Sequence, residues 1–462
     1  AIAIIRNYNQ KQKGIEFKSS SLLVDNFIEL LPFKLTNSQK NVWKEIKEDL
    51  TSSHQMVRLL QGDVGSGKTI IALLTILQAI ESGFQTAMMV PTSILAFQHF
   101  NNVQILFKKL DIKIIILTGK DKGNSRLEKL KKIKSGEAKL VIGTHALIQD
   151  DVTFNSIGLV VIDEQHRFGV FQRMAFTNKG RKPSILVMSA TPIPRTLALA
   201  AYGDMDESKI TEKPIGRLPI KTTSLSLLKE KKLIERLLIK LQSNEKAYWV
   251  CPLIEESEEL DLKAAKERYE HLNKIFNKKV LIIHGQLKEK EKEEVMHKFQ
   301  NEDYKILVST TVIEVGIDIK EATTIIIEHA ERFGLAQLHQ LRGRVGRNDI
   351  QSSCILLHKD QIGENAKKRI IKMKETNDGF EIAKKDLEIR GPGEVLGRKQ
   401  SGLPSFQIAD LSFDGDLLED VRKYVDLIFQ NDPKLETNEG MNLKNLLYLF
   451  ERDVAIKTLQ AG

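Results

Sequence analysis

Apolar residues in this chain fall into short continuous runs rather than alternating with polar residues. Six runs lie between residues 56 and 189 and six more between residues 222 and 358, with helix-length segments between them. Runs of this kind, rich in Val, Ile and Leu, are typical of strands buried on both faces of a parallel sheet. The pattern therefore predicts an α/β protein with two tandem doubly wound parallel-sheet domains.

The predicted elements can be given by residue range. In the first domain we expect strands at 56–60, 86–90, 113–117, 139–143, 158–163 and 184–189, and helices at 38–50, 69–82, 93–109, 125–135 and 194–203. In the second we expect strands at 222–227, 247–254, 279–284, 305–310, 323–328 and 353–358, and helices at 229–242, 261–277, 288–300 and 335–342.

Turn-prone segments and changes of pattern divide the chain into five predicted parts. These are a helical connector at 1–33, the first α/β domain at 34–215, the second at 216–360, a helical hairpin with its loop at 361–402, and a mostly helical extension at 403–462. The hairpin is broken at Asn377-Asp378-Gly379, a sequence typical of a turn.

Composition narrows the class of protein only a little. The 462 residues are too many for one hydrophobic core, so more than one domain is expected. The net charge of +9 is compatible with nucleic-acid binding, but a solvated basic surface explains it nearly as well. Cys251 and Cys354 lie inside apolar runs, which predicts buried thiols in a reducing compartment. No apolar run reaches the 18 residues of a membrane span and no secretory leader opens the sequence, so we expect a cytoplasmic protein.

The clearest candidate site is GDVGSGKT at residues 62–69, which fits the phosphate-loop pattern of Gly, four residues and Gly-Lys-[Ser/Thr]. It lies between a predicted strand and a predicted helix, where backbone N–H groups and the helix dipole favour an anion. Lys68 is expected to reach the β- and γ-phosphates of a nucleotide, and Thr69 to ligate Mg²⁺. The residues predicted to bind the nucleotide here are Gly62, Gly65, Ser66, Gly67, Lys68 and Thr69.

Two further candidates end strands of the first domain. Asp163 and Glu164 lie at the end of strand 158–163, and we predict that Asp163 holds Mg²⁺ while Glu164 deprotonates the attacking water. An ordinary surface loop is the alternative for such a pair. Ser189 and Thr191 lie at the end of strand 184–189 and can couple nucleotide state to a neighbour through their hydroxyls, although a helix N-cap is the simpler role.

The second domain has no phosphate loop but presents arginines in QLRGRVGR at 340–347. Arg344 and Arg347 are three residues apart and lie on one face if the segment is helical, which predicts arginine fingers for the γ-phosphate. A solvated basic helix end is the alternative. Upstream, Gly316 allows close backbone approach and Asp318 can contact ribose or an arginine finger, with a plain surface turn as the alternative.

In order along the chain, these segments resemble the motifs of a superfamily 2 helicase core. They are GDVGSGKT as motif I, PTSILAFQH (91–99) as Ia, GTHALI (143–148) as Ib, DEQH (163–166) as II, SATPIPRT (189–196) as III, TTVIEVGIDI (310–319) as V and QLRGRVGR as VI. LPFKLTNSQ (31–39), DEQHRFGV (163–170), LHQLRGRVGR (338–347) and AKKDLEIRGPGEVLGRKQSG (383–402) are similar to the bacterial RecG DNA helicases. The resemblance implies two RecA-like domains and a translocation motif at 361–402. Residues 1–33 match only the helical connection that follows this family's N-terminal wedge domain.

The resemblance also implies roles for further residues. Phe33 and Gln39 match the segment that recognises adenine. The residues that match nucleic-acid backbone contacts are Thr92, Thr118, Gly119, Thr144 and Thr311, and those that match coupling positions are Ser189, Thr191, Gln340, Arg390 and Gln400. Hydroxyl and backbone N–H groups at strand ends contact phosphates without reading bases, so binding should be independent of sequence and sensitive to salt.

The function that the resemblance implies is that of an ATP-dependent, Mg²⁺-requiring DNA helicase. Such an enzyme translocates on duplex DNA and remodels branched DNA, such as stalled forks and Holliday junctions, in recombination and repair. The implied partners are branched DNA and single-stranded-DNA-binding protein, with no membrane, a monomeric state and a location at the bacterial nucleoid. Two alternatives stay open: a transcription-repair coupling translocase acting on RNA polymerase, and a non-motor ATP-dependent switch that binds DNA. Pro392, where the coupling factor typically has Ala, and complete motifs V and VI count against them.

Overall fold

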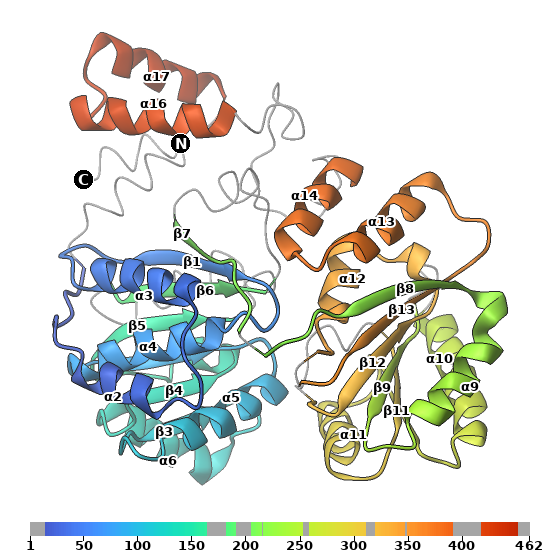
Figure 1. The fold of residues 1–462 in the computed structure, drawn as a ribbon. Helices are drawn as coiled ribbons and strands as arrows, with labels where there is room; N and C mark the ends of the chain where they lie inside the picture. The colour runs from blue at the N-terminus through green and yellow to red at the C-terminus, as the bar shows by residue number, and fades with distance from the viewer. Residues whose placement is uncertain are drawn as a thin grey trace. The chain divides into compact units, whose positions relative to one another are not determined.

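The computed structural model describes residues 14–163, 182–190, 205–214, 216–252, 258–310, 319–346, 349–390 and 417–450. The chain divides into two compact units (Figure 1). Unit 1 comprises Ala1–Gly62, Gly67–Glu212 and Arg390–Gly462, and unit 2 comprises Asp63–Ser66 and Lys213–Ile389.

A seven-stranded parallel sheet forms the centre of unit 1, with the order β3-β4-β2-β5-β6-β1-β7. Its strands are β1 (Val57–Gly62), β2 (Gln85–Met89), β3 (Ile114–Leu117), β4 (Leu140–Gly143), β5 (Ile157–Ile162), β6 (Ser184–Ser189) and β7 (Asp206–Ile210). The register pairs Gln61 of β1 with Ser189 of β6, so the ends of these two strands lie side by side. All the strands predicted for the first domain are present, as β1 to β6.

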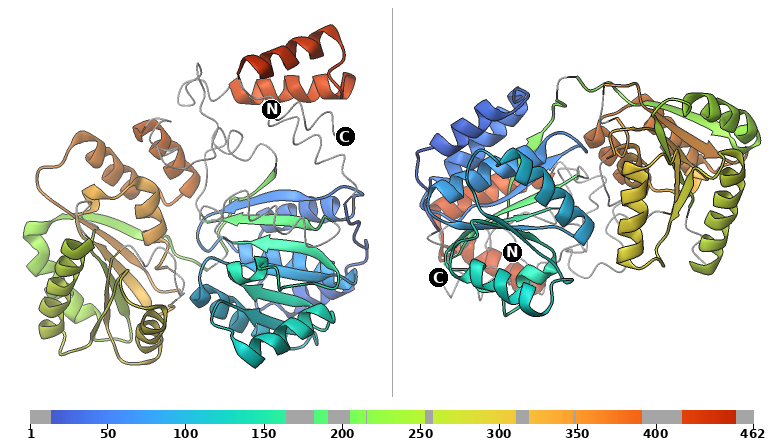
Figure 2. Two further views of the ribbon diagram at one scale, coloured as in Figure 1. Left: turned by 180° about the vertical axis from the view of Figure 1, so that it is seen from behind. Right: turned by 90° about the horizontal axis from the view of Figure 1, so that it is seen from below.

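Helices cover both faces of this sheet (Figure 2). They are α2 (Leu22–Leu30), α3 (Asn37–Leu50), α4 (Lys68–Glu81), α5 (Ser93–Leu106) and α6 (Gly123–Lys134), with the 3₁₀ turn η1 (His145–Ile148). Because successive side chains of a strand point to opposite faces, Leu159 and Val161 of β5 join the core under α3 and α4. Val160 and Ile162 join the opposite core, which includes Ile133 of α6. Burial of both faces explains the continuous apolar runs.

Within unit 1, the segment that precedes α3 packs against α4 and its neighbours. Phe17 stacks edge-on against Phe84, with 5.5 Å between ring centroids, and Phe27 does so against Phe107 at 5.4 Å. The carboxylate of Glu81, the last residue of α4, accepts hydrogen bonds from the backbone N–H groups of Leu22 (2.9 Å) and Leu23 (3.0 Å). Glu81 therefore caps the start of α2.

A six-stranded parallel sheet with the order β10-β11-β9-β12-β13-β8 forms the centre of unit 2. Its strands are β8 (Lys221–Ser226), β9 (Lys246–Val250), β10 (Val280–Ile283), β11 (Ile306–Ser309), β12 (Ala322–Ile327) and β13 (Ser353–His358). Its helices are α9 (Glu230–Lys240), α10 (Glu258–Ile275), α11 (Glu289–Asn301), α12 (Leu335–Arg342), α13 (Glu364–Glu375) and α14 (Gly379–Arg390), with the 3₁₀ turns η3 (Leu227–Lys229) and η5 (Ala330–Arg332). The two α/β folds agree with the predicted fold class.

The helical hairpin is built from α13 and α14, and Ile370, Met373 and Ile382 join the same hydrophobic core as α12. Further along the chain, α16 (Leu417–Asn431) and α17 (Asn438–Leu449) pack on each other around Ile428, Phe429 and Leu435. The predicted helix at 194–203 lies outside the described residues.

Two strands differ from the expectation. β7 is absent from the predicted set because its sequence, DESKI, contains a single apolar residue. It is an edge strand held by polar side chains: Arg58 donates to Ser208 (2.8 Å) and Gln61 to Glu207 (2.6 Å). β9 ends at Val250, earlier than the predicted residue 254, since Pro252 has no N–H to continue a ladder.

Both cysteines are buried free thiols, as predicted. Burial raises the pKa of Cys354 to about 12, and burial together with the neighbouring Glu328 raises that of Cys251 as well. Among the helices of the described residues, none is long and apolar enough to cross a bilayer.

Candidate nucleotide-binding site

The phosphate loop leaves β1 at Gly62 and enters α4 at Lys68. Gly65 (φ +76°) and Gly67 (φ +91°) adopt left-handed conformations that residues with a Cβ rarely occupy. Gly67 makes no side-chain cap at the start of α4, and no acidic residue lies in the first turn of this helix. The backbone N–H groups of this turn therefore form a cradle suited to an anionic phosphate.

Lys68 lies at the base of this cradle. Its side chain is largely buried, and its Nζ donates to the carbonyl of Gly62 at 2.6 Å. A buried ammonium held against the backbone of this loop fits a polyphosphate ligand. Thr69 follows within the first turn of α4, and its hydroxyl is a hard oxygen donor of the kind that Mg²⁺ prefers.

Gln39 lies against this loop. Its Oε1 accepts from the N–H of Thr36 (2.9 Å) and its own N–H donates to the Thr36 hydroxyl (3.2 Å), which forms a capping box at the start of α3. A Cβ on Gly67 would come within 2.3 Å of the Gln39 Nε2. Phe33 is 46% exposed. The adenine-recognition role of both residues stays a prediction.

Gly67→Ala is expected to weaken nucleotide binding by about tenfold or more, because a left-handed alanine costs about 1–2 kcal/mol and its Cβ also meets Gln39. The binding of a fluorescent ATP analogue measures this change. Gly83→Ala is the matched control, since Gly83 has a similar φ of +94° but a Cβ added there would meet nothing within 4 Å.

The double variant Gly67→Ala/Gln39→Ala removes the steric contact but leaves the backbone strain. Because Gln39 is itself assigned to adenine, the reference for this double variant is Gln39→Ala, and we expect the two to bind nucleotide almost equally well if contact with Gln39 is the larger cost. An unchanged affinity for Gly67→Ala would show that the left-handed backbone at this position does not shape the site.

Asp163 directly follows β5, and its N–H donates to the carbonyl of Met89 at 2.9 Å. β6 lies between β5 and β1 in the sheet, so Asp163, Ser189 and the start of the phosphate loop lie at the carboxyl ends of three neighbouring strands. Carboxylate and hydroxyl oxygens from Asp163 and Thr69 are donors that fit Mg²⁺. Glu164 and Thr191 lie outside the described residues.

The predicted nucleic-acid contacts of unit 1 also follow strands. Thr92 is the N-cap of α5, and its hydroxyl accepts from the N–H of Leu95 (3.3 Å). Thr118 is buried, and its N–H donates to Asp121 (2.8 Å), whereas Gly119 beside it is exposed. A Cβ on Gly119 would meet nothing within 4 Å, so neither space nor φ requires glycine there and the backbone is open to an approaching ligand. Thr144 is buried next to η1.

In unit 2, α12 ends at Arg342, so Arg344 lies in the turn beyond the helix, and the alignment of Arg344 and Arg347 on one helical face does not apply. Gln340 is a half-buried residue in the last turn of α12. The remaining residues predicted for motif V and the later segments, namely Thr311, Gly316, Asp318, Arg347 and Gln400, lie outside the described residues, as does the side chain of Arg390 at the end of α14.

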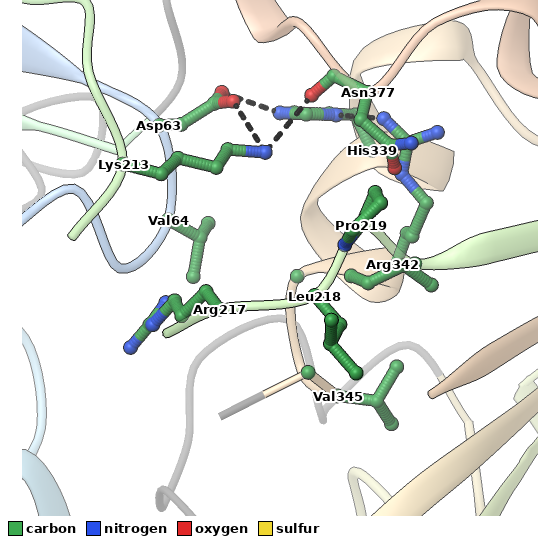
Figure 3. Close-up of a pocket in the computed structure, with 13 residues that line it drawn as sticks. Asp63, Val64, Lys213, Arg217, Leu218, Pro219, His339, Arg342, Val345 and Asn377 are labelled. Atoms are coloured by element: carbon green, nitrogen blue, oxygen red, sulfur yellow. Dashed lines mark hydrogen bonds and ion pairs between the residues drawn. The ribbon is translucent and has the colours of Figure 1, made fainter. Parts of the chain in front are cut away.

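Arg342 is fully buried and ties α12 to the hairpin. Its Nη1 donates to the carbonyls of Met373 and Thr376, both at 2.8 Å. Its Nη2 lies 2.9 Å from His339 Nδ1. Because guanidinium only donates, His339 accepts at Nδ1 and carries its proton on Nε2, which lies 2.8 Å from Asp63 (Figure 3).

Asp63 is the acceptor at the centre of this network (Figure 3). Burial opposes its ionisation, but the bond from His339 and the nearby Lys213 hold the pKa of Asp63 below its usual range. Burial lowers the pKa of His339. The adjoining pocket has a volume of about 180 Å³, below the roughly 300–1,000 Å³ of typical ligand sites, so we assign it no ligand of its own.

Comparison with known proteins agrees with this geometry. The DEAD/DEAH box helicase family matches residues 36–200, and the helicase conserved C-terminal domain matches residues 229–349. Residues 376–454 match the C-terminal part of domain 3 of the ATP-dependent DNA helicase RecG. The chain is 48% identical over 420 residues to the ATP-dependent DNA helicase RecG of Bacillus subtilis, covering 90% of this chain and 61% of that protein. The chain belongs to the RecG family.

RecG relatives from other bacteria are similar to the same degree. RecG of Thermotoga maritima is 50% identical over 424 residues, covering 91% of this chain and 54% of that protein. A structure of RecG bound to a three-way DNA junction superposes with a TM-score of 0.76 at 46% identity, covering 90% of this chain and 55% of that one. The chain thus spans less than two thirds of the length of these RecG proteins.

Several residues of the site were not predicted from sequence. His99, at the end of PTSILAFQH, lies 3.2 Å from Asp163, and His339 and Arg342 form the network described above. The RecG resemblance includes all three within its motifs but does not indicate their partners. Only the folded chain brings residues 64 positions apart, such as His99 and Asp163, into contact.

Proposed function

We propose that this chain is the ATP-driven motor of a DNA helicase that translocates on duplex DNA and remodels branched DNA, such as stalled forks and Holliday junctions. The observation that carries the proposal is the phosphate loop, where two left-handed glycines precede an uncapped helix and a buried lysine. The likeness to a RecG described as bound to a three-way DNA junction supports the choice of substrate. The similarity to RecG proteins favours neither a transcription-repair coupling translocase acting on RNA polymerase nor a non-motor ATP-dependent switch that binds DNA.

Within this proposal, the backbone of the phosphate loop and Lys68 hold the phosphates of ATP. Thr69 and Asp163 hold Mg²⁺, which offsets phosphate charge when bound. Glu164 orients the attacking water and accepts its proton. Arg344 and Arg347 stabilise the negative charge on the transferred γ-phosphoryl group. Phe33 and Gln39 select adenine.

The DNA backbone is contacted through residues at strand ends, namely Thr92, Thr118, Gly119, Thr144 and Thr311. Residues 34–215 and 216–360 act as the two helicase domains, and the hairpin at 361–402 transmits movement through Arg390 and Gln400. We further propose that the protein works as a monomer at the bacterial nucleoid, with single-stranded-DNA-binding protein as a partner.

Steady-state ATP hydrolysis with no DNA, with plain duplex and with a synthetic fork tests this function. We expect DNA to stimulate hydrolysis, and we expect the stimulation to fall as salt rises from about 50 to about 200 mM, because phosphate contacts release counterions. Equal stimulation by duplex and fork would locate branch selectivity outside this chain. Hydrolysis that ignores both DNAs would contradict the proposed motor.

A further inference from the structure

His99 and Asp163 form a pair that the predicted roles do not include. The Nε2 of His99 lies 3.2 Å from Oδ2 of Asp163. Both side chains are largely buried, with 12% and 14% of their surface exposed. Among the described residues, it is His99 whose side chain hydrogen-bonds to the carboxylate of Asp163, the group assigned to Mg²⁺.

The chemistry of the pair determines where the proton lies. An ionised carboxylate only accepts hydrogen bonds, so Nε2 must carry the hydrogen for this bond to form. One oxygen of Asp163 is then engaged by His99, and the carboxylate is held in a single orientation. Its second oxygen remains the one that can face a cation.

The backbone holds both partners of this pair. The N–H of Asp163 donates to the carbonyl of Met89, the last residue of β2. The next helix along the chain, α5, carries His99 and packs on the sheet through Ala96 and Val103, which lie three residues before and four after it. Residues at these spacings share one helical face, so His99 points toward the sheet. One β-strand and helix unit therefore fixes both the main chain and the side chain of Asp163.

We propose that His99 is a positioning residue for the magnesium site, holding Asp163 through the Nε2–H···Oδ2 bond so that its other oxygen faces the cation. This role rests on the proposed function, since it requires that Asp163 serves Mg²⁺. Hydrogen bonds to a liganding carboxylate orient the ligand, and their loss typically costs about 10–100-fold in metal affinity.

Mn²⁺ serves as the probe, because it prefers the same oxygen ligands and free Mn²⁺ is measured directly by electron paramagnetic resonance. Its affinity is measured for the full chain with a non-hydrolysable β,γ-imido analogue of ATP. His99→Leu removes the donor while keeping a side chain of similar size, and His99→Gln restores an N–H donor. We expect His99→Leu to weaken Mn²⁺ binding by about 10–100-fold and His99→Gln to recover most of that loss.

Asp163→Asn separates this role from the assignment of the site itself. If Asp163→Asn weakens Mn²⁺ binding but His99→Leu matches the wild type, the positioning role is wrong and the magnesium site stands. If Asp163→Asn also matches the wild type, the magnesium assignment is wrong and the role of His99 is lost with it. Equal impairment in His99→Leu and His99→Gln would indicate packing rather than hydrogen bonding.

A second measurement determines the protonated nitrogen of His99 in the wild-type protein itself. In histidine-labelled wild-type protein, ¹⁵N nuclear magnetic resonance distinguishes the two ring nitrogens of His99. We expect the proton on Nε2, with a signal that is absent in His99→Gln and shifted in Asp163→Asn. A proton on Nδ1 alone would exclude the bond and overturn the proposal.

Discussion

Lys68→Met is expected to reduce ATP hydrolysis by about 10²–10³-fold, the usual cost of removing one preorganised donor from developing transition-state charge. Lys68 lies at the start of α4, and its ammonium is held against the carbonyl of Gly62 inside the phosphate loop. Methionine fills a similar volume without the charge. The rate of phosphate release at saturating ATP and Mg²⁺, with and without duplex DNA, measures the loss.

Lys44→Met is the matched control for this variant. Lys44 lies on α3 of the same unit with 79% of its side chain exposed, so the same chemical change there should leave hydrolysis unchanged. Near-normal turnover by Lys68→Met, with a melting temperature equal to that of the wild type, would remove Lys68 from the catalytic site.

Glu164→Gln is expected to lower the hydrolysis rate by about 10³-fold, because a positioned general base contributes about 10²–10⁴-fold and glutamine cannot accept the proton. Glu164 lies outside the described residues, but in the sequence it directly follows Asp163, which is the first residue after β5. Nucleotide affinity should be retained, since the residue is assigned to the water and not to the phosphates. Single-turnover hydrolysis and equilibrium binding of ATP, measured side by side, separate the two effects.

The comparison of Glu164→Gln with Lys68→Met adds a further check. Lys68→Met should impair hydrolysis and weaken binding of the triphosphate, whereas Glu164→Gln should impair hydrolysis alone. Loss of ATP binding in Glu164→Gln would mean that this carboxylate supports the metal or the loop and is not the base.

The fold was predictable because its signals are local. Strands such as β5 and β6 are buried on both faces and therefore read as continuous apolar runs. The phosphate loop is likewise contiguous in sequence, and Gly65 and Gly67 within it have left-handed conformations. Edge strand β7 escaped prediction because it is stabilised by pairing with β1 and by polar side chains, neither of which leaves an apolar pattern.

The rest of the site depends on contacts between distant residues. In the sequence, His99 ends PTSILAFQH and Asp163 begins DEQH, and nothing in either motif connects them. They meet because β2, which precedes the helix of His99, and β5, which precedes Asp163, are neighbours in the sheet. The predicted helix at 335–342 has the same bounds as α12. The position of Arg344 was not predictable, because it depends on the path of the backbone after the helix ends at Arg342. Hydrogen bonds to backbone carbonyls, such as those from Arg342 to Met373 and Thr376, leave no trace in side-chain patterns.

The two cysteines of the chain, Cys251 and Cys354, make it suited to site-specific fluorescent labelling. Maleimide dyes react with exposed thiolates, whereas both native thiols are buried with raised pKa values and should stay unlabelled in the folded protein. Lys44→Cys on α3 and Lys368→Cys on α13 would each introduce one reactive site on an exposed position, one in each unit. Energy transfer between dyes at these two positions would follow the distance between the units through a cycle of ATP turnover, without first removing any native cysteine.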